Sequence, residues 1–166
     1  MILRLFVLLI LATPAYAEIG DIGKIKGSGA LERGNESIIA EQGVSVQTMD
    51  TAVTADAKMR IDFVDDTRVD ITQHSRLLID EFVYDPANDI GSLSLKATLG
   101  TVRYASGQIA KKYQQNVKIR TPSATIGVRG TDFIMVVDEM GLSLIHISEP
   151  TRPRLISDAV FCLKKK

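Results

Sequence analysis

Apolar and polar residues alternate with a period of two along most of the chain. The alternation is clear over residues 59–63 and 68–71, and it recurs over residues 44–47, 93–97 and 117–120. Because successive side chains of a strand point to opposite faces, this period is typical of β-strands that are buried on one side. Outside the N-terminal apolar segment, no stretch shows a helical period of 3.6. Short strands at nearly regular spacing predict an all-β domain.

The segments around these runs predict turns and further strands. Residues 64–67 predict a tight hairpin, because aspartate tolerates turn geometry and hydrogen-bonds to its own backbone. One strand is expected around residues 23–30, a loop at residues 85–89, and a polar loop or edge at residues 111–116. The continuous apolar run of residues 133–137 predicts a strand buried on both faces. This pattern fits a short β-helix-like solenoid, a rolled sheet or a sandwich.

The first 17 residues have the pattern of a secretory signal peptide. Arg4 supplies a positive charge, residues 5–12 are apolar, and Ala15-Tyr16-Ala17 supplies the small residues of a cleavage site. The apolar run is far shorter than the ~20 residues that a membrane-spanning helix needs. We therefore predict that residues 1–17 are cleaved, and that the protein is exported to the periplasm, cell surface or medium without a retained transmembrane helix.

Residues 142–166 resemble a translated sequencing adapter. The run Leu-Ser-Leu-Ile-His-Ile-Ser-Glu-Pro-Thr-Arg, residues 142–152, resembles a transposase-end adapter read in frame, and residues 156–163 resemble a flow-cell primer. The alternative is a genuine amphipathic tail. If the segment is adapter, no native structure is expected after Gly141, and the domain of residues 18–141 is truncated at its C-terminal side.

Charge and cysteine content narrow the chemistry of residues 18–141. This range holds 14 Lys and Arg against 18 Asp and Glu, a net charge of 14 − 18 = −4. Such a domain has no global basic surface for nucleic acid. The single cysteine, Cys162, lies in the adapter-like tail. The domain therefore lacks a thiol for a disulfide, a nucleophile or a metal site.

Residues 121–133, with the sequence Thr-Pro-Ser-Ala-Thr-Ile-Gly-Val-Arg-Gly-Thr-Asp-Phe, combine one proline, two glycines and one arginine. Pro122 keeps the residue before it out of helical geometry and marks the end or edge of a strand. Gly127 and Gly130 permit backbone angles or close approaches that a side chain forbids. Arg129 is therefore expected at a crowded kink, where its five donors satisfy carbonyl groups or pair with an aspartate.

These residues resemble the signature of the FecR domain: Thr-Pro, a small residue, then Gly-Val-Arg-Gly-Thr, one residue and an aromatic. Residues 59–85 are similar to the family's hairpin with an Asp-rich turn and the strand that follows it. Residues 93–107 are similar to its central strand pair marked by glycine, and the resemblance as a whole covers residues 23–137. It implies a structural role for seven motif residues: Thr121, Pro122, Gly127, Arg129, Gly130, Thr131 and Phe133.

The resemblance also implies an exported β-rich module. The best-known relatives are inner-membrane sensors, whose extracytoplasmic part contacts an outer-membrane transporter and whose cytoplasmic segment controls a sigma factor. This sequence departs from that plan, because it shows no cytoplasmic sigma-binding region before the domain. Many relatives with a plain signal peptide are stand-alone exported proteins.

No constellation of side chains predicts catalysis. Asp62, Asp65, Asp66 and Asp70 surround one hairpin turn and are expected to be solvated. A weak calcium site is the alternative, since this ion needs several oxygen ligands. His74 has no evident partner for acid–base or metal chemistry.

The remaining polar motifs have structural or incidental explanations. Ser123 and Thr131 are expected to form turn hydrogen bonds, and anion binding is the alternative role for Arg129. The basic step of residues 111–113 is too short to predict binding to a membrane or nucleic acid, and the glycosylation tripeptide of residues 35–37 is a chance match. We therefore expect no enzyme activity, no cofactor and no metal site.

The sequence thus predicts an exported FecR-like binding module. The expected partner is a protein or cell-envelope material such as glycan, because an exposed strand edge pairs with an extended partner. Two alternatives stay open: the extracytoplasmic part of a transmembrane system that regulates a sigma factor, and a structural module of a larger surface protein. Nucleic acid is not an expected partner.

Overall fold

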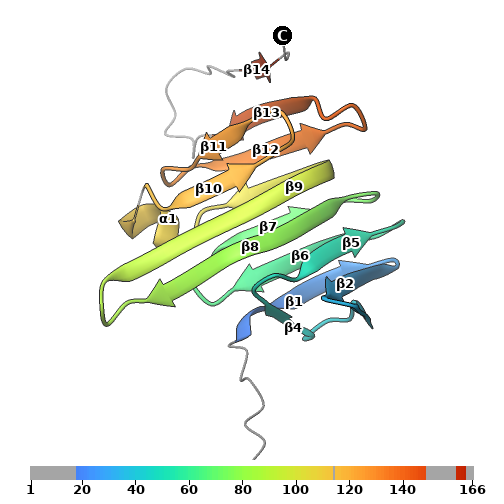
Figure 1. Ribbon diagram of the computed structural model, residues 1–166, viewed down its shortest axis with the longest axis horizontal. Coiled ribbons are helices and arrows are strands. Elements are labelled where there is room, and N and C mark those ends of the chain that lie inside the picture. The colour runs from blue at the N-terminus through green and yellow to red at the C-terminus, as the bar shows by residue number, and fades with distance from the viewer. Residues whose placement is uncertain (1–17, 114, 149–159, 164–166) are drawn as a thin grey trace, which may run out of the picture.

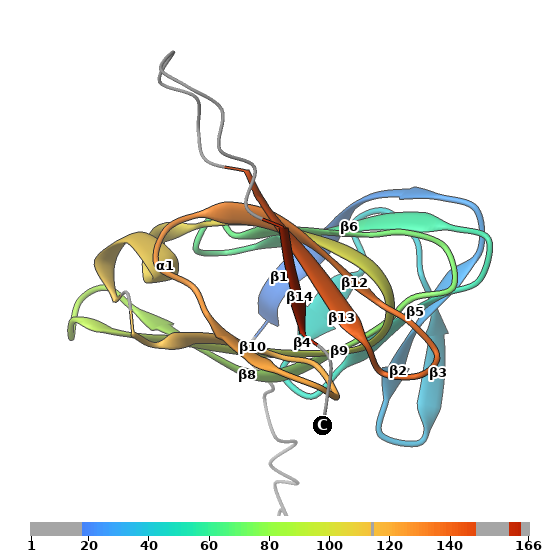
Figure 2. The ribbon, with the colours of Figure 1, turned by 90° about the horizontal axis from the view of Figure 1, so that it is seen from above.

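The described residues form fourteen strands and one short helix, and the strands make a single sheet that folds over onto itself. The computed structural model describes residues 18–113, 115–148 and 160–163, so the predicted signal peptide lies outside the described residues. The long strand β9 (Ile90–Ala105) runs through both halves of the sheet and divides it into two layers, called here layer A and layer B (Figures 1 and 2). The predicted all-β class and rolled-sheet architecture are confirmed.

Layer A combines strands from both ends of the chain, and all its neighbouring strands are antiparallel. In spatial order it holds β4 (Ser45–Gln47), β1 (Glu18–Lys26), β6 (Lys58–Phe63), β7 (Arg68–Ile71), the second half of β9, β12 (Asp132–Val137), β13 (Ser143–Ser148) and β14 (Val160–Leu163).

Layer B is antiparallel except at one pair, where β10 runs parallel to β9. In spatial order it holds β3 (Glu36–Ile39), β2 (Gly29–Arg33), β5 (Thr51–Thr54), β8 (Arg76–Asp85), the first half of β9, β10 (Val117–Arg120) and β11 (Thr125–Gly127). A parallel pair requires a long crossover, and this crossover contains the helix α1 (Gln108–Lys112).

The hydrophobic core lies between the two layers. In β6, Met59, Ile61 and Phe63 are buried, while the polar residues between them face outward, as the alternation predicts. Phe63 of layer A stacks on Phe82 of layer B, with ring centroids 5.3 Å apart. Figure 2 shows that β9 curves from one layer into the other, with α1 at the opposite, open side.

Two predicted strands differ from the structure. Val136 is 39% exposed, whereas Phe133, Met135 and Val137 are buried, so β12 is covered on one face and the prediction of burial on both faces is wrong. The reason is that layer A has the core on its inner side only. The strand expected around residues 23–30 is interrupted by a turn at Gly27, whose φ is +97°, and it contributes to β1 and β2.

The helix α1 was not expected from the sequence, which predicts a polar loop or edge at residues 111–116. The helix spans only five residues, so its periodicity is too short to recognise. Its apolar residues Ile109 and Ala110 are fully buried, and they close the open side between the layers.

Residues 143–148, for which no native structure is expected, form β13 and pair with β12 over its whole length. A strand edge accepts any extended segment of suitable alternation, because the ladder uses only backbone groups. The pairing therefore does not depend on whether the segment is native, and the adapter origin of residues 142–166 stays a prediction.

Gly100 is the residue at which β9 passes from layer B to layer A. Leu99 is the last β9 residue paired with β8, and Gly100 is the first paired with β12. Gly100 has a φ of +91°, and a Cβ there would lie 2.0 Å from Ser75 Oγ and 2.6 Å from Ser75 Cα. Only glycine combines this backbone angle with this close approach.

We expect Gly100→Ala to lower the free energy of unfolding by about 2–4 kcal/mol, the sum of left-handed strain and overpacking. Urea denaturation measures the change. The control is Gly127→Ala, because Gly127 has no atom within 4 Å of its Cβ position and this exposed site should change stability by less than about 0.5 kcal/mol. Equal effects of the two substitutions would contradict this role of Gly100.

Candidate functional site

The predicted motif begins with a closed turn after β10. The Thr121 backbone N–H donates to the Ala124 carbonyl (2.8 Å), and the Ala124 N–H donates to Thr121 Oγ1 (3.1 Å). Thr121 Oγ1 also accepts a hydrogen bond from Ser143 Oγ (2.8 Å), and Ser123 Oγ lies 2.9 Å from Ser143 Oγ. Pro122 is exposed at the end of the strand. Thr121 supplies the side-chain hydrogen bond of this turn, whereas the Ser123 hydroxyl contacts Ser143 of β13.

The centre of the motif has one buried and one exposed side chain. Arg129 is exposed, and its neighbour Val128 is the buried residue, with 2% exposure. The Val128 N–H donates to the Val117 carbonyl (3.1 Å), which holds this segment against β10. Gly130 has a φ of +73° and needs to be glycine, whereas Gly127 has open space at its Cβ position. The left-handed backbone position of the motif is therefore Gly130, and its buried side chain is that of Val128.

The end of the motif attaches β12 to the end of β9. Ser106 Oγ donates to the Thr131 carbonyl (2.8 Å), and the Ser106 N–H donates to Asp132 Oδ1 (2.9 Å). Phe133 is buried and stacks on Tyr104 of β9, with ring centroids 5.4 Å apart. The geometry of these residues fits the structural role that the motif predicts for Thr131 and Phe133.

Asp65 is the buried polar group that the sequence interpretation missed. It lies in the predicted hairpin of residues 64–67, which the structure contains, but its side chain has no exposure. Its carboxylate accepts hydrogen bonds from the Thr67 N–H (3.1 Å), Thr67 Oγ1 (2.8 Å) and the Ile109 N–H (3.1 Å). Its carbonyl accepts from the Gln108 N–H (2.7 Å). Asp65 thus joins the β6–β7 turn to the first turn of α1.

The close approach of these two turns also depends on Gly107. A Cβ on Gly107 would lie 2.3 Å from the Thr67 nitrogen and 2.5 Å from the Asp65 carbonyl oxygen. The sequence signal was present as Asp-Asp-Thr before one strand and Gly-Gln before the helix. This signal did not show which aspartate is buried, because the sequence does not distinguish two adjacent aspartates in a turn.

The other three aspartates of the predicted cluster do not converge with Asp65. Asp66 is exposed, whereas Asp62 and Asp70 are half-buried on the outer face of the hairpin. Asp70 pairs with Arg60, whose Nε lies 2.7 Å from Oδ1, and this hydrogen bond raises the pKa of Arg60. Among the described residues, no group of three His, Cys, Asp or Glu side chains has an arrangement suited to a metal ion.

Asp50 is a second buried carboxylate. Arg33 binds it through Nε (2.8 Å) and Nη2 (2.7 Å), and the Gln47 N–H donates to Oδ2 (2.9 Å). The two-point hydrogen bond to Asp50 raises the pKa of Arg33. This pair fixes β2 to the turn between β4 and β5.

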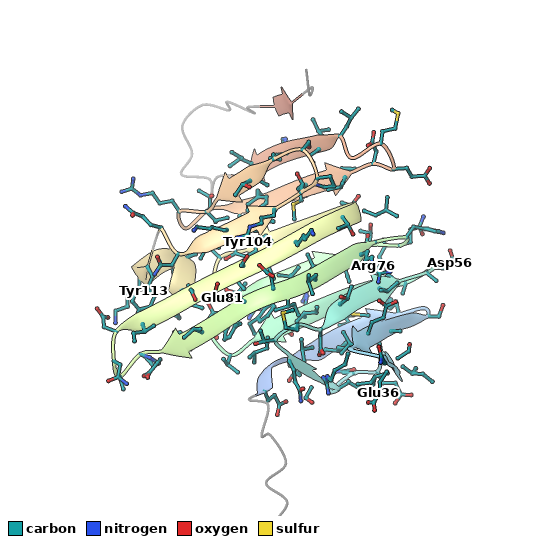
Figure 3. All side chains as sticks on the ribbon, viewed as in Figure 1. Glu36, Asp56, Arg76, Glu81, Tyr104 and Tyr113 are labelled. Carbon is teal, nitrogen blue, oxygen red and sulfur yellow. The ribbon has the colours of Figure 1, made fainter. Side chains whose placement is uncertain are left out.

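The remaining candidates lie apart from one another. His74 is exposed, in a left-handed turn conformation with a φ of +54°, and its Nε2 lies 3.9 Å from Asp56 Oδ1. Tyr104, labelled in Figure 3, is fully buried, and burial raises the pKa of its hydroxyl. That hydroxyl lies near Thr67 and Ser106 but forms no hydrogen bond of normal geometry.

Lys112 and Tyr113, of the predicted basic-aromatic step, hold the β8–β9 loop. Lys112 Nζ lies 2.5 Å from Asp89 Oδ1, and Tyr113 Oη donates to the same oxygen (3.2 Å). The hydrogen bond from Lys112 and its charge lower the pKa of Asp89, and the bond to Tyr113 adds to this effect. Asp85, in the same loop, has its pKa lowered by hydrogen bonds from Asn88.

We expect Lys112→Met to raise the pKa of Asp89 toward its ordinary value, since the ionised carboxylate loses its closest cation. The pKa of Asp85 should not move, because its partners belong to its own loop. Side-chain carbonyl chemical shifts in an NMR titration report both groups. A shift of both pKa values, or of neither, would contradict the assigned contact.

We expect Asp65→Asn to destabilise the protein by about 2–3 kcal/mol, because an amide nitrogen would face buried N–H and O–H donors that need an acceptor. The matched control is Asp66→Asn in the same turn, where exposure predicts a change below about 0.5 kcal/mol. Thermal and urea unfolding measure both variants. Similar stabilities of the two variants would refute the buried role of Asp65.

The fold also assembles a basic groove that the sequence does not reveal. Its lining side chains come from β1, β6, β7, β9 and β12, on the outer face of layer A. The cations are Lys24, Lys26, Lys58, Arg60 and Arg103. Lys24 and Arg103 lie 79 positions apart in the sequence (103 − 24). The five cations therefore do not form a local run of positive charge that the sequence would reveal.

Comparison with protein families gives one match. The model of the family described as FecR protein matches residues 49–148, well over half of the 166 residues. This agrees with the resemblance seen in the motif. Searches among curated proteins and among solved structures found no significant match. Within the described part of the chain, no helix has the length and apolar character that a bilayer crossing requires.

Proposed function

Because the chain belongs to the FecR family, we propose that it is an exported binding module that receives a protein partner at the β12 edge of layer A, in the place that residues 143–148 take in this structure. FecR domains are typical of transmembrane signalling systems that regulate sigma factors. Binding, and not catalysis, is the role that the arrangement of side chains supports. The edge of β12 is the observation that carries the proposal.

The β12 edge supports the proposal because it accepts a strand along its full length. All six residues of β12 pair with β13, from Asp132 opposite Ser148 to Val137 opposite Ser143. The edge strands β4, β3 and β11 hold three, four and three residues, so they offer shorter ladders. An extended partner gains affinity from such a ladder and specificity from alternate side chains.

The same edge carries a cluster of exposed apolar side chains. Among the described residues, ten large apolar side chains are exposed, and five of them lie in or between β12 and β13. The five are Val136, Met140, Leu142, Leu144 and Ile147. Of these, Val136 and Met140 belong to residues 18–141, and Val136 is an exposed apolar side chain on β12 that an added strand would contact.

The family favours a second candidate, which is sensing. In this function the module is the extracytoplasmic part of a signalling system, and its partner is a membrane protein of that system. The third hypothesis, a structural module of a larger surface protein, makes the same edge an internal contact. The identity of the partner separates these functions.

We expect a photo-reactive residue at Val136 to crosslink a partner from cell-envelope extract, in a chain that ends at Gly141 and leaves the β12 edge open. The control places the same residue at Ile39, which is 74% exposed on the far edge of layer B. Partner binding should also slow hydrogen exchange at residues 132–137. Equal crosslinking from both positions, or none from Val136, would contradict strand addition at β12. A membrane signalling protein as the captured partner would support sensing.

A further inference from the structure

The groove on the outer face of layer A concentrates positive charge in an acidic domain. It has a volume of about 420 Å³. Its charged lining residues are five cations and one acid, Asp70, whereas residues 18–141 have a net charge of −4. The excess of positive charge is therefore confined to this face of the domain.

The register of β1 and β6 places like charges directly opposite each other. Lys26 lies opposite Lys58, and Lys24 lies opposite Arg60. Such pairs destabilise a sheet. No salt bridge within the described residues joins the three lysines or Arg103 to a carboxylate. Four cations thus face the groove without an acidic partner within salt-bridge distance, and a bound anion would relieve their repulsion.

A β-bulge produces this arrangement. Ile22 pairs with Ile61, while Lys24 pairs with Arg60, so Gly23 is an extra residue in β1. If Gly23 instead paired opposite Arg60 in regular register, Lys24 would lie opposite Met59 and point into the core. Because a one-residue change of register reverses the faces of a strand, the bulge at Gly23 turns Lys24 and Lys26 toward the groove.

The ion pair of Arg60 and Asp70 orients one donor group in the groove. Arg60 Nε lies 2.7 Å from Asp70 Oδ1, and Nη2 lies 3.4 Å from Oδ2. The guanidinium has five N–H donors in a plane, so donors remain after this contact. Ile134 adds apolar surface beside the charged groups.

The geometry of the groove favours one chemical class of ligand. An acidic peptide recognised as an added strand needs free backbone groups, but β6, β7 and the second half of β9, which form the middle of the groove, each have a paired strand on both sides. The lining residues include no aromatic side chain, whereas single-stranded nucleic acids rely on aromatic stacking. A ligand that carries separate anionic groups on a polar framework matches the positions of these cations, which are spread over several strands.

We propose that this groove binds an anionic oligosaccharide, whose sugars carry carboxylate or phosphate groups. The inference rests on the proposed binding role and gives it a second surface, distinct from the β12 edge. Lys24, Lys26, Lys58 and Arg103 neutralise the anionic groups, and Arg60, held by Asp70, donates hydrogen bonds to one of them.

Calorimetric titration of the purified protein tests the groove. The probes are trigalacturonate and glucose 1,6-bisphosphate, with maltotriose as the neutral match. We expect an anionic probe to bind and maltotriose to be silent. The double variant K26Q/K58Q should weaken binding by at least about tenfold, a loss of the size expected from removing two charge contacts. The control K96Q/K118Q removes two exposed lysines from the outer face of layer B, and its affinity should stay within about twofold of the unchanged protein.

Thermal unfolding provides a readout that does not require binding. K26Q/K58Q should melt at the same temperature as the unchanged protein or higher, because it removes an opposed pair of like charges. The anionic probe should raise the melting temperature of the unchanged protein more than that of K26Q/K58Q.

Several outcomes would overturn the inference. They are silence of both anionic probes, equal loss of affinity in the two double variants, tetraglutamate binding as tightly as the sugars, or binding only to vesicles that contain phosphatidylglycerol. If neither anionic probe binds while Val136 still crosslinks a partner, the oligosaccharide site is refuted and the proposed function is unaffected.

Discussion

The buried carboxylate of Asp65 is the polar contact on which the rolled sheet depends. It accepts hydrogen bonds from Thr67 on the β6–β7 turn and from Ile109 at the start of α1. A buried carboxylate without such partners would be costly. With them, it fixes the helix across the open side of the two layers, where Ile109 and Ala110 complete the core. The parallel return of the chain from β9 to β10 passes through this point.

The second constraint is the change of layer within β9. Gly100 allows a single strand to serve layer B with its first half and layer A with its second half. The inner faces of the two layers are then occupied by the core, so the protein has only outer faces and edges to offer to a partner. Both proposed surfaces lie on layer A: one is the edge at β12, and the other is its outer face.

These two surfaces suit different chemistry. The β12 edge offers backbone groups and exposed apolar side chains, which favours an extended protein segment. The basic groove lies over the middle strands, whose backbone groups are already paired, and it offers cations. A module of the FecR family with both surfaces has the means to contact a protein partner and an anionic carbohydrate at the same time.

The alternation of residues 59–63, 68–71 and 117–120 was sufficient to predict strands and the all-β class, because side-chain period is a local property of a strand. The turn at residues 64–67 and the family motif were also local, and both were found. At the family motif, Val128 is buried and its neighbour Arg129 is exposed. Sequence alone does not tell which of two adjacent residues points inward at an irregular turn.

The sequence also does not tell which of Asp65 and Asp66 is buried; the structure shows that Asp65 is buried and Asp66 is exposed. The basic groove is still harder to predict from sequence. Lys24 and Lys58 become neighbours only through the register of β1 and β6, which the bulge at Gly23 sets. Arg103 joins them only because β9 pairs with β7 after its bend. The sequence therefore determined the strands, the class and the family, since these follow from local period and motif. Tertiary structure alone decided which carboxylate is buried and which cations meet, because these depend on long-range pairing.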